Sequence, residues 1–211
     1  GLLNEVPALV ILNESIRNLF FHVPLWFAMT LLLFVAMIYS IKYLLSDKIE
    51  HDQLSLSLIE VATLFGCLGF LSGTLWAKST WGGWLPPDIK IIGASITLIF
   101  YGAYFILRNA IEQENKRARI SAVYNIMACA SMIIFIYVLP RLKGADSLHP
   151  GSGGNPGFNT YDLDSGLRLI FYPAVIAWIL LSIWIASLRF RIKKLERLRL
   201  INKLYDVEKD Y

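Results

Sequence analysis

The 211-residue sequence is 56% hydrophobic and 17% charged, with a mean hydropathy of +0.54. This composition excludes an ordinary water-soluble domain, whose surface needs a larger share of charged residues. The net charge of +4 brings nucleic-acid binding into consideration. However, the basic residues lie in loops and at one tail rather than along a helix or strand that could enter a groove of a nucleic-acid duplex. Nucleic-acid binding is therefore set aside.

Five stretches of 17 to 21 residues carry no charged side chain: 23–41, 61–77, 91–107, 120–140 and 169–188. Each can cross the hydrocarbon core, about 30 Å thick, as an α-helix. A membrane β-strand would instead alternate polar and apolar residues, and these segments do not. The sequence therefore predicts an all-α, polytopic integral membrane helical bundle. We expect one transmembrane domain over residues 1–211, with five spans at about 23–45, 56–77, 89–108, 120–140 and 167–189.

Lysine and arginine are distributed unequally between the two ends of these spans. Of the 20 basic residues, fourteen lie at one end and six at the other. Because short cytoplasmic loops hold the positive excess, the fourteen mark the cytoplasmic side. We therefore expect outward loops at 1–22, 78–88 and 141–166, a cytoplasmic tail at 190–211, and a bacterial inner-membrane location with the outward side periplasmic. An outward N-terminus needs a helix or signal to carry it across the membrane, so we expect a sixth spanning helix ahead of Gly1.

This topology separates the three histidines into two groups. His51 falls on the cytoplasmic side, whereas His22 and His149 both face outward. His22 stands at the entrance to the first span, and His149 lies in the long loop. Taken singly, an interfacial polar residue is the simpler interpretation of each, and their shared side raises the case for a ligand site only modestly.

Tryptophans gather on the same outward side. Those that lie within nine residues of one another are Trp76, Trp81 and Trp84. An interfacial aromatic belt accounts for one or two of them, but it does not require the Gly82 and Gly83 between two indoles. Glycines allow positive φ and close backbone approach, two prolines stiffen the exit, and Asp88 can cap the following helix. The segment predicts a short, ordered apolar platform at the outer membrane surface.

An iron porphyrin suits this inventory better than any other common ligand. Neutral imidazoles bind haem iron axially, and indoles border or stack on the macrocycle. Outward cations can pair with its two propionates. The candidates for that role are Lys78, Lys90, Arg141 and Arg168. For each cation alone, a snorkelling side chain at the interface is the simpler explanation.

The sequence resembles the haem-handling proteins with a tryptophan-rich WWD motif, and most closely the CcmC family of cytochrome c maturation. The resemblance covers nearly the whole chain, and proteins of that family also have one helix ahead of the position where this sequence starts. Its motifs are His22-Val23-Pro24, Gly-Thr-Leu-Trp-Ala-Lys at 73–78, Trp81-Gly82-Gly83-Trp84, Leu148-His149-Pro150 and Leu167-Arg168.

By this resemblance, His22 and His149 would be the axial ligands of a bound haem b. The motif residues that would cradle the macrocycle are Trp81, Trp84 and Asp88, and the basic residues near the site are Lys90 and Arg168. One departure is that the family reads Trp-Gly-x-Trp-Trp-x-Trp-Asp, whereas Leu-Pro-Pro at 85–87 replaces two of the indoles. Haem contact on that edge is expected to be weaker or differently shaped.

The resemblance also implies a function. Proteins of this family take haem at the outer leaflet and present it to the periplasmic haem chaperone CcmE, together with CcmD and the ABC transporter subunits CcmA and CcmB. The present chain has no Gly-x-x-x-x-Gly-Lys-Ser/Thr phosphate loop, so it is not the ATPase, and we expect no enzymatic activity of its own.

Two other functions fit the sequence less well. A membrane cytochrome b-type electron-transfer subunit would hold haem with histidines deep in its spans, and none of the five predicted spans contains one. An ion transporter would carry charged residues at mid-span. Only Lys42 and Glu60 come close, and both stand near cytoplasmic ends of helices.

Overall fold

The computed structural model describes residues 12–142, 147–149, 163 and 165–209. The described part of the chain is helical and contains no strand. Its long helices are α1 (Leu19–Ser46), α2 (Ile49–Trp81), α3 (Ile89–Asn109), α4 (Glu114–Met132) and α5 (Ser165–Lys209). The short ones are the 3-10 helices η1 (Asn13–Asn18) and η3 (Leu139–Arg141) and the π-helix η2 (Ile133–Val138), which continues α4. Five helical segments are long and apolar enough to span a membrane, which confirms the predicted all-α, multi-pass class.

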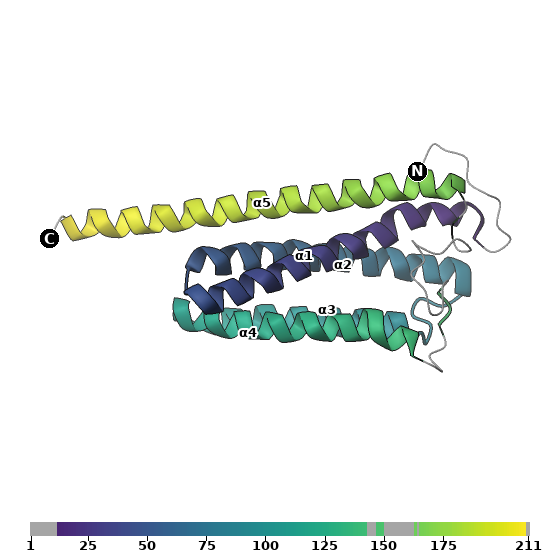
Figure 1. Cartoon of the computed structure of the whole chain (residues 1–211), viewed down its shortest axis with the longest axis horizontal. Helices are drawn as coiled ribbons and strands as arrows, with labels where there is room; N and C mark the ends of the chain where they lie inside the picture. The colour runs from purple at the N-terminus through teal and green to yellow at the C-terminus, as the bar shows by residue number, and fades with distance from the viewer. Residues whose placement is uncertain (1–11, 143–146, 150–162, 164, 210–211) are drawn as a thin grey trace.

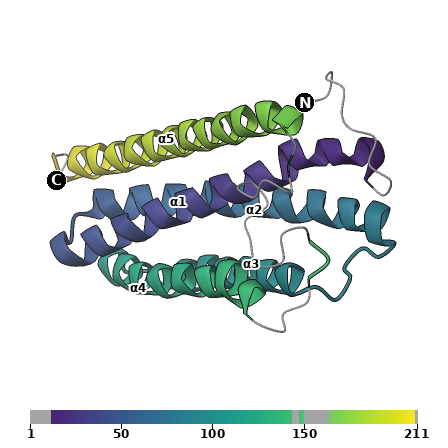
Figure 2. The same cartoon turned by 45° about the vertical axis from the view of Figure 1, so that its right-hand side comes forward.

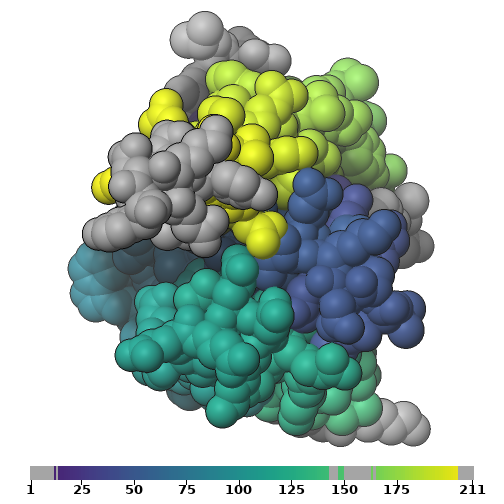
Figure 3. Space-filling view, turned by 90° about the vertical axis from the view of Figure 1, so that its left-hand side faces the viewer, coloured from purple at the N-terminus to yellow at the C-terminus, as the bar shows by residue number. Residues whose placement is uncertain are grey.

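The helices form three layers (Figures 1 and 2). The antiparallel pair α1 and α2 is central, α5 packs along one side of it, and the α3–α4 hairpin packs along the other. Figure 3 shows the same order from one end, with α5 above the α1–α2 loop and the α3–α4 hairpin below. The main buried cluster lies where α1 and α2 meet their neighbours, around Met29, Leu33 and Phe65.

The helices continue beyond the predicted spans. Residues 13–22, expected in an outward loop, are helical, and α2 begins at Ile49 rather than near residue 56. α5 continues through most of the predicted cytoplasmic tail as one helix. Hydropathy marks only the part of a helix that is apolar, whereas hydrogen bonding carries the helix on into polar sequence. Residues 1–11 and most of the predicted outward loop 141–166 lie outside the described residues.

The outer surfaces of the helices are apolar, as a lipid environment requires. Large exposed side chains in the spanning parts of α2, α3 and α5 include Leu68, Leu71, Leu75, Ile99, Ile106, Leu180, Ile183 and Trp184. Contiguous exposure of this kind is unfavourable in water and favourable in hydrocarbon.

A proline in the first turns of α1 is compensated by a neighbouring helix. Pro24 has no N–H, so the carbonyl of Phe20, four residues earlier, loses its helical partner. The indole N–H of Trp178 on α5 donates to this carbonyl at 3.3 Å. An unpaired carbonyl is costly in an apolar environment, and this hydrogen bond therefore fixes α5 against the N-terminal part of α1.

The middle of α5 is held by ion pairs. The carboxylate of Glu60 on α2 accepts hydrogen bonds from the Arg189 guanidinium at 2.9 Å and the Lys193 ammonium at 2.8 Å. The Lys194 ammonium lies 3.4 Å from a carboxylate oxygen of Glu50. The basic tail therefore runs beside the N-terminal part of α2 before it projects beyond the bundle (Figure 1).

One buried ion pair links α2 to the end of α3. The Arg108 guanidinium donates to both carboxylate oxygens of Asp52, at 2.8 and 2.6 Å. The two side chains are only 9% and 5% exposed, so neither charge has water as an alternative partner. Removing one partner would leave the other charge buried and unpaired.

We expect Arg108→Ala to destabilise the protein by about 3 kcal/mol, because it leaves the Asp52 carboxylate without a counter-charge. The matched control is Arg119→Ala, since Arg119 pairs with Asp47 at 3.5 Å with both side chains more than half exposed. That variant should lose less than about 1 kcal/mol. Thermal unfolding in one detergent measures both, and equal losses would contradict the interpretation.

Candidate functional site

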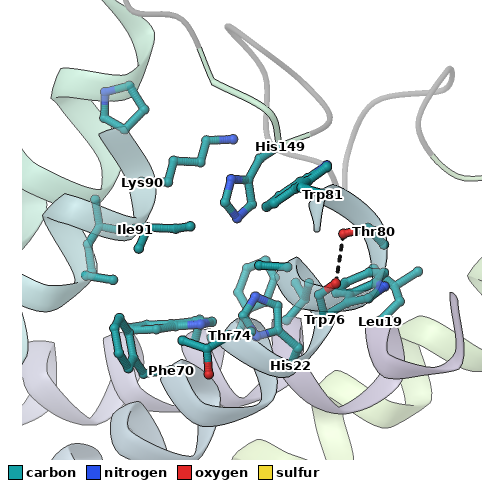
Figure 4. A pocket seen from close by; sticks show the side chains of 18 of the residues that line it. Leu19, His22, Phe70, Thr74, Trp76, Thr80, Trp81, Lys90, Ile91 and His149 are labelled. Atoms are coloured by element: carbon teal, nitrogen blue, oxygen red, sulfur yellow. Dashed lines mark hydrogen bonds between the residues drawn. The ribbon is translucent and has the colours of Figure 1, made fainter. Parts of the chain in front are cut away.

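An apolar cavity of about 290 Å³ opens at the end of the bundle opposite the basic tail. Its walls come from η1, α1, α2, α3, the π-helix η2, η3 and the start of α5. The predicted site residues that line it are His22, Trp76, Trp81, Lys90, Arg141 and His149. Its volume is near the lower end of the range for small-molecule pockets. Figure 4 shows the two imidazoles projecting into this space from different segments, with Trp76 near His22 and Trp81 beside His149.

The orientation of His22 is set by the backbone of α2. His22 lies in the first turn of α1, and its Nδ1 is 2.9 Å from the carbonyl oxygen of Gly69. A carbonyl only accepts hydrogen bonds, so Nδ1 carries the proton and donates. In the neutral imidazole, Nε2 is then the unprotonated nitrogen, with a lone pair available to a ligand.

Two indoles lie beside the His22 ring. Trp26, one turn further along α1, has its ring centroid 6.4 Å from that of His22, and Trp76 of α2 has its centroid at 5.9 Å. Both contacts are edge-to-face. The Trp76 indole N–H donates to the Ser15 hydroxyl at 3.2 Å, so the polar atom of this indole is satisfied while the ring borders the cavity.

The second histidine is held by a buried carboxylate. His149 Nδ1 is 3.1 Å from Asp88 Oδ1, and the Asp88 side chain is completely buried. The other carboxylate oxygen accepts the Ser147 hydroxyl at 2.8 Å and the Leu148 amide at 2.7 Å. Asp88 thus fixes the segment 147–149 and leaves Nε2 of His149 as the nitrogen without this partner.

Asp88 is also the N-cap of α3, as the sequence predicted. Its Oδ1 accepts the backbone N–H groups of Lys90 at 2.8 Å and Ile91 at 3.3 Å. Burial alone would raise the pKa of the Asp88 carboxyl, but the hydrogen bonds from His149, Ser147 and the Leu148 amide outweigh it and hold the pKa well below its ordinary value. The carboxylate is therefore ionised throughout the physiological range.

The end of α2 places the second pair of aromatic rings. The Trp81 ring centroid lies 5.0 Å from that of His149. Trp81 is the last residue of α2, and Gly82 follows it with φ at 78°, a backbone conformation that residues with a side chain rarely adopt. The predicted positive φ is therefore confirmed at Gly82, which ends the helix directly after the indole. Lys78 Nζ donates to the Gly82 carbonyl at 2.8 Å.

Of the four predicted propionate partners, two reach the cavity. Lys90 and Arg141 line it, whereas Lys78 and Arg168 do not. The Arg141 guanidinium lies over the Tyr137 ring, 5.9 Å from its centroid, and donates to the Tyr137 carbonyl. Arg168 donates to the carbonyl of Leu163 at 3.0 Å.

The residues predicted to cradle the macrocycle do not lie together in the structure. Trp84 is 56% exposed, and neither it nor Gly82, Gly83 or Asp88 lines the cavity. Trp84 follows the turn at Gly82, which leads the chain away from the helix axis, whereas Trp81 is still helical. Asp88 lies behind His149 rather than facing the cavity.

Several residues that line the cavity were not predicted from the sequence. They include Phe27, Phe70, Gly73 and Ile136 as well as Trp26 and Tyr137. Trp26 had a usable signal, since it follows His22 by one helical turn. Tyr137 had none, because its place depends on the π-helix η2 and on its hydrogen bond with Thr30 at 2.7 Å.

The donor set does not suit a bare metal ion. Among the described residues, no group of three or more His, Cys, Asp or Glu side chains could hold one. Two imidazoles lining an apolar cavity with aromatic walls instead fit a metal that brings its own equatorial ligands.

Comparisons with known proteins give a consistent family. The sequence matches the family model described as heme exporter protein C (CcmC) over residues 3–203. Similar curated proteins include cytochrome c biogenesis proteins CcsA of Prochlorococcus marinus. The one from strain MIT 9303 is 33% identical over 100 residues, which are 47% of this chain and 30% of the relative. The one from strain AS9601 is 41% identical over 63 residues, 30% of this chain and 20% of the relative. The chain thus spans less than a third of the length of these relatives.

We expect Asp88→Ala to release segment 147–149 from the start of α3, because the Leu148 amide, the Ser147 hydroxyl and His149 lose one common acceptor. Loss of hydrogen bonds to a charged group should speed amide exchange at Leu148 by about tenfold or more. Hydrogen exchange read by mass spectrometry measures this. Ser147→Ala is the control, since it removes one donor and keeps the helix cap, and exchange that is equally fast in wild type and Asp88→Ala would refute the assignment.

Proposed function

The chain belongs to the heme exporter protein C (CcmC) family, and we propose that it binds haem at the outward end of its helix bundle as part of cytochrome c maturation. Haem is the cargo in this proposal. It brings an iron with two axial positions, a flat apolar ring and two carboxylates. The cavity residues match each of these features.

The observation that carries the proposal is that the two histidines share one cavity and one hydrogen-bonding pattern. His22 and His149 come from segments far apart in the sequence, line one cavity, and each has its Nδ1 on an oxygen acceptor. Imidazoles that ligate metals have this arrangement, in which a carbonyl or carboxylate on one nitrogen orients the ring and raises the basicity of the other. The arrangement supports axial ligation by His22 and His149.

The remaining walls suit the rest of the ligand. Trp26 and Trp76 offer indole surfaces beside His22, and Trp81 offers one beside His149. Lys90 and Arg141 are the cations that could meet the propionates. Trp84, Gly82 and Gly83 are better suited to shaping the outward turn than to contacting the macrocycle.

The charge distribution supports an orientation in the bacterial inner membrane. The fourteen lysines and arginines at the far end, half of them in the tail at 190–211, favour a cytoplasmic position for that end. The cavity, with His22 and His149, would then face the periplasm.

Delivery is the step that follows from such a site. A haem held near the outer surface by two reversible nitrogen ligands can be passed on without any covalent chemistry by this chain, so we propose a binding and delivery protein rather than an enzyme. The family resemblance points to the haem chaperone CcmE as the acceptor, with CcmD and the ABC subunits CcmA and CcmB as partners. The curated CcsA relatives are named for the same process. An electron-transfer subunit of the cytochrome b type is less well supported, since both histidines lie at one end of the bundle.

We expect the purified protein to bind haem b with a Soret band, and His22→Ala or His149→Ala to shift that band and weaken haem affinity by more than about tenfold. The matched control is His51→Ala, because His51 lies at the opposite end, with its Nδ1 3.0 Å from the Ser46 hydroxyl. Haem titration by absorption measures all four proteins. Unchanged spectra in both site variants would overturn the assignment.

Substitutions of Trp81 and Trp84, the two tryptophans of the Trp-Gly-Gly-Trp segment, should affect haem affinity to different extents. Trp81→Ala removes an indole beside His149 and is expected to lower haem affinity about fivefold, which corresponds to about 1 kcal/mol for an aromatic contact. Trp84→Ala should leave affinity nearly unchanged, since Trp84 does not line the cavity. The same titration tests the pair, and a larger effect for Trp84→Ala would show that its side chain turns inward.

A further inference from the structure

Three glycines of α2 face three large side chains of α1 in register. The facing pairs are Gly66 with Met29, Gly69 with Trp26, and Gly73 with His22. The order reverses because the two helices run antiparallel. Small residues on one helix let the partner approach closely, but the third pair involves a candidate iron ligand rather than a simple packing residue.

The His22 ring occupies the volume that a side chain at position 73 would need. A Cβ atom built on Gly73 would lie 2.5 Å from His22 Cε1 and 3.1 Å from Nδ1. Carbon atoms in contact are normally about 3.5 Å or more apart. The rigid imidazole would therefore have to move away. At Gly66 the crowded atom is the Met29 sulfur, 2.6 Å away, and a flexible thioether can adapt.

The absence of a side chain at position 73 also exposes the acceptor that orients the imidazole. In an α-helix the carbonyl of residue i points toward residue i+4, so the Gly69 carbonyl lies beneath residue 73. Its oxygen accepts the Ser72 hydroxyl at 3.0 Å as well as His22 Nδ1 at 2.9 Å. A side chain at 73 would cover the approach that the imidazole uses.

We propose that Gly73 is a positioning residue for the iron ligand His22: its missing side chain lets the imidazole sit on the Gly69 carbonyl with Nε2 presented to haem. This inference rests on the proposed haem-binding function. Gly73 acts here through His22, and the geometry requires no contact between Gly73 and the macrocycle.

The test compares full-length Gly73→Ala with wild type, His22→Ala and Gly66→Ala, each titrated with haemin in one detergent. Gly73→Ala should weaken haem binding about tenfold to hundredfold, as the loss of an outer partner of a metal ligand does, and should move the absorption spectrum toward that of His22→Ala. Gly66→Ala, which is equally crowded but faces Met29, should keep the wild-type spectrum. A wild-type spectrum in Gly73→Ala, with His22→Ala altered, would overturn this inference and leave the haem function standing.

A double variant keeps the test decisive if Gly73→Ala folds poorly. In His22→Ala/Gly73→Ala the new methyl group enters the space that the imidazole leaves. If Gly73 acts through His22, the double variant should match His22→Ala in spectrum and thermal midpoint, so the two changes are non-additive. Equal losses from Gly73→Ala with and without His22 would refute the inference. If wild type itself binds no haemin, the proposed function fails.

Discussion

The site depends on two buried oxygen acceptors, the Gly69 carbonyl and the Asp88 carboxylate. Each binds the Nδ1 of one histidine, at 2.9 Å for His22 and 3.1 Å for His149. A polar group surrounded by apolar walls must find a partner, and that requirement fixes both rings. The first acceptor belongs to the middle of α2 and the second to the start of α3, so the packing of these helices decides where the imidazoles lie.

The same requirement organises the rest of the bundle. Trp178 replaces the hydrogen bond that Pro24 removes from Phe20, and Arg108 neutralises Asp52 at the opposite end. Polar groups are thus paired inside while leucines and isoleucines cover the outer faces of the spanning helices. The end that contains the cavity differs, because there the pairing leaves one nitrogen of each histidine directed away from its acceptor. Such an end can bind a ligand without disturbing the helices that support it.

Particular residues show how far sequence reasoning extends. Asp88 was recognised as a helix cap because a carboxylate directly before an apolar run meets the free N–H groups of the first turn. The spacing of the glycines at 66, 69 and 73 does not reveal which residue of α1 each one meets, so their facing partners come only from the structure. Trp84 was grouped with Trp81 because they are neighbours in sequence, but helix α2 ends between them, and only Trp81 reaches the cavity.

The sequence by itself determined the all-helical membrane class, because about 20 uncharged residues suffice to span hydrocarbon, and it supplied a set of candidate site residues. Only the tertiary structure decided which of these candidates share a cavity. Lys90 and Arg141 line it while Lys78 and Arg168 do not, and Gly73 supports His22 across a helix interface. Hydropathy is a local property of the chain, whereas a binding site arises from contacts between helices, and these depend on rotation and register that no single segment encodes.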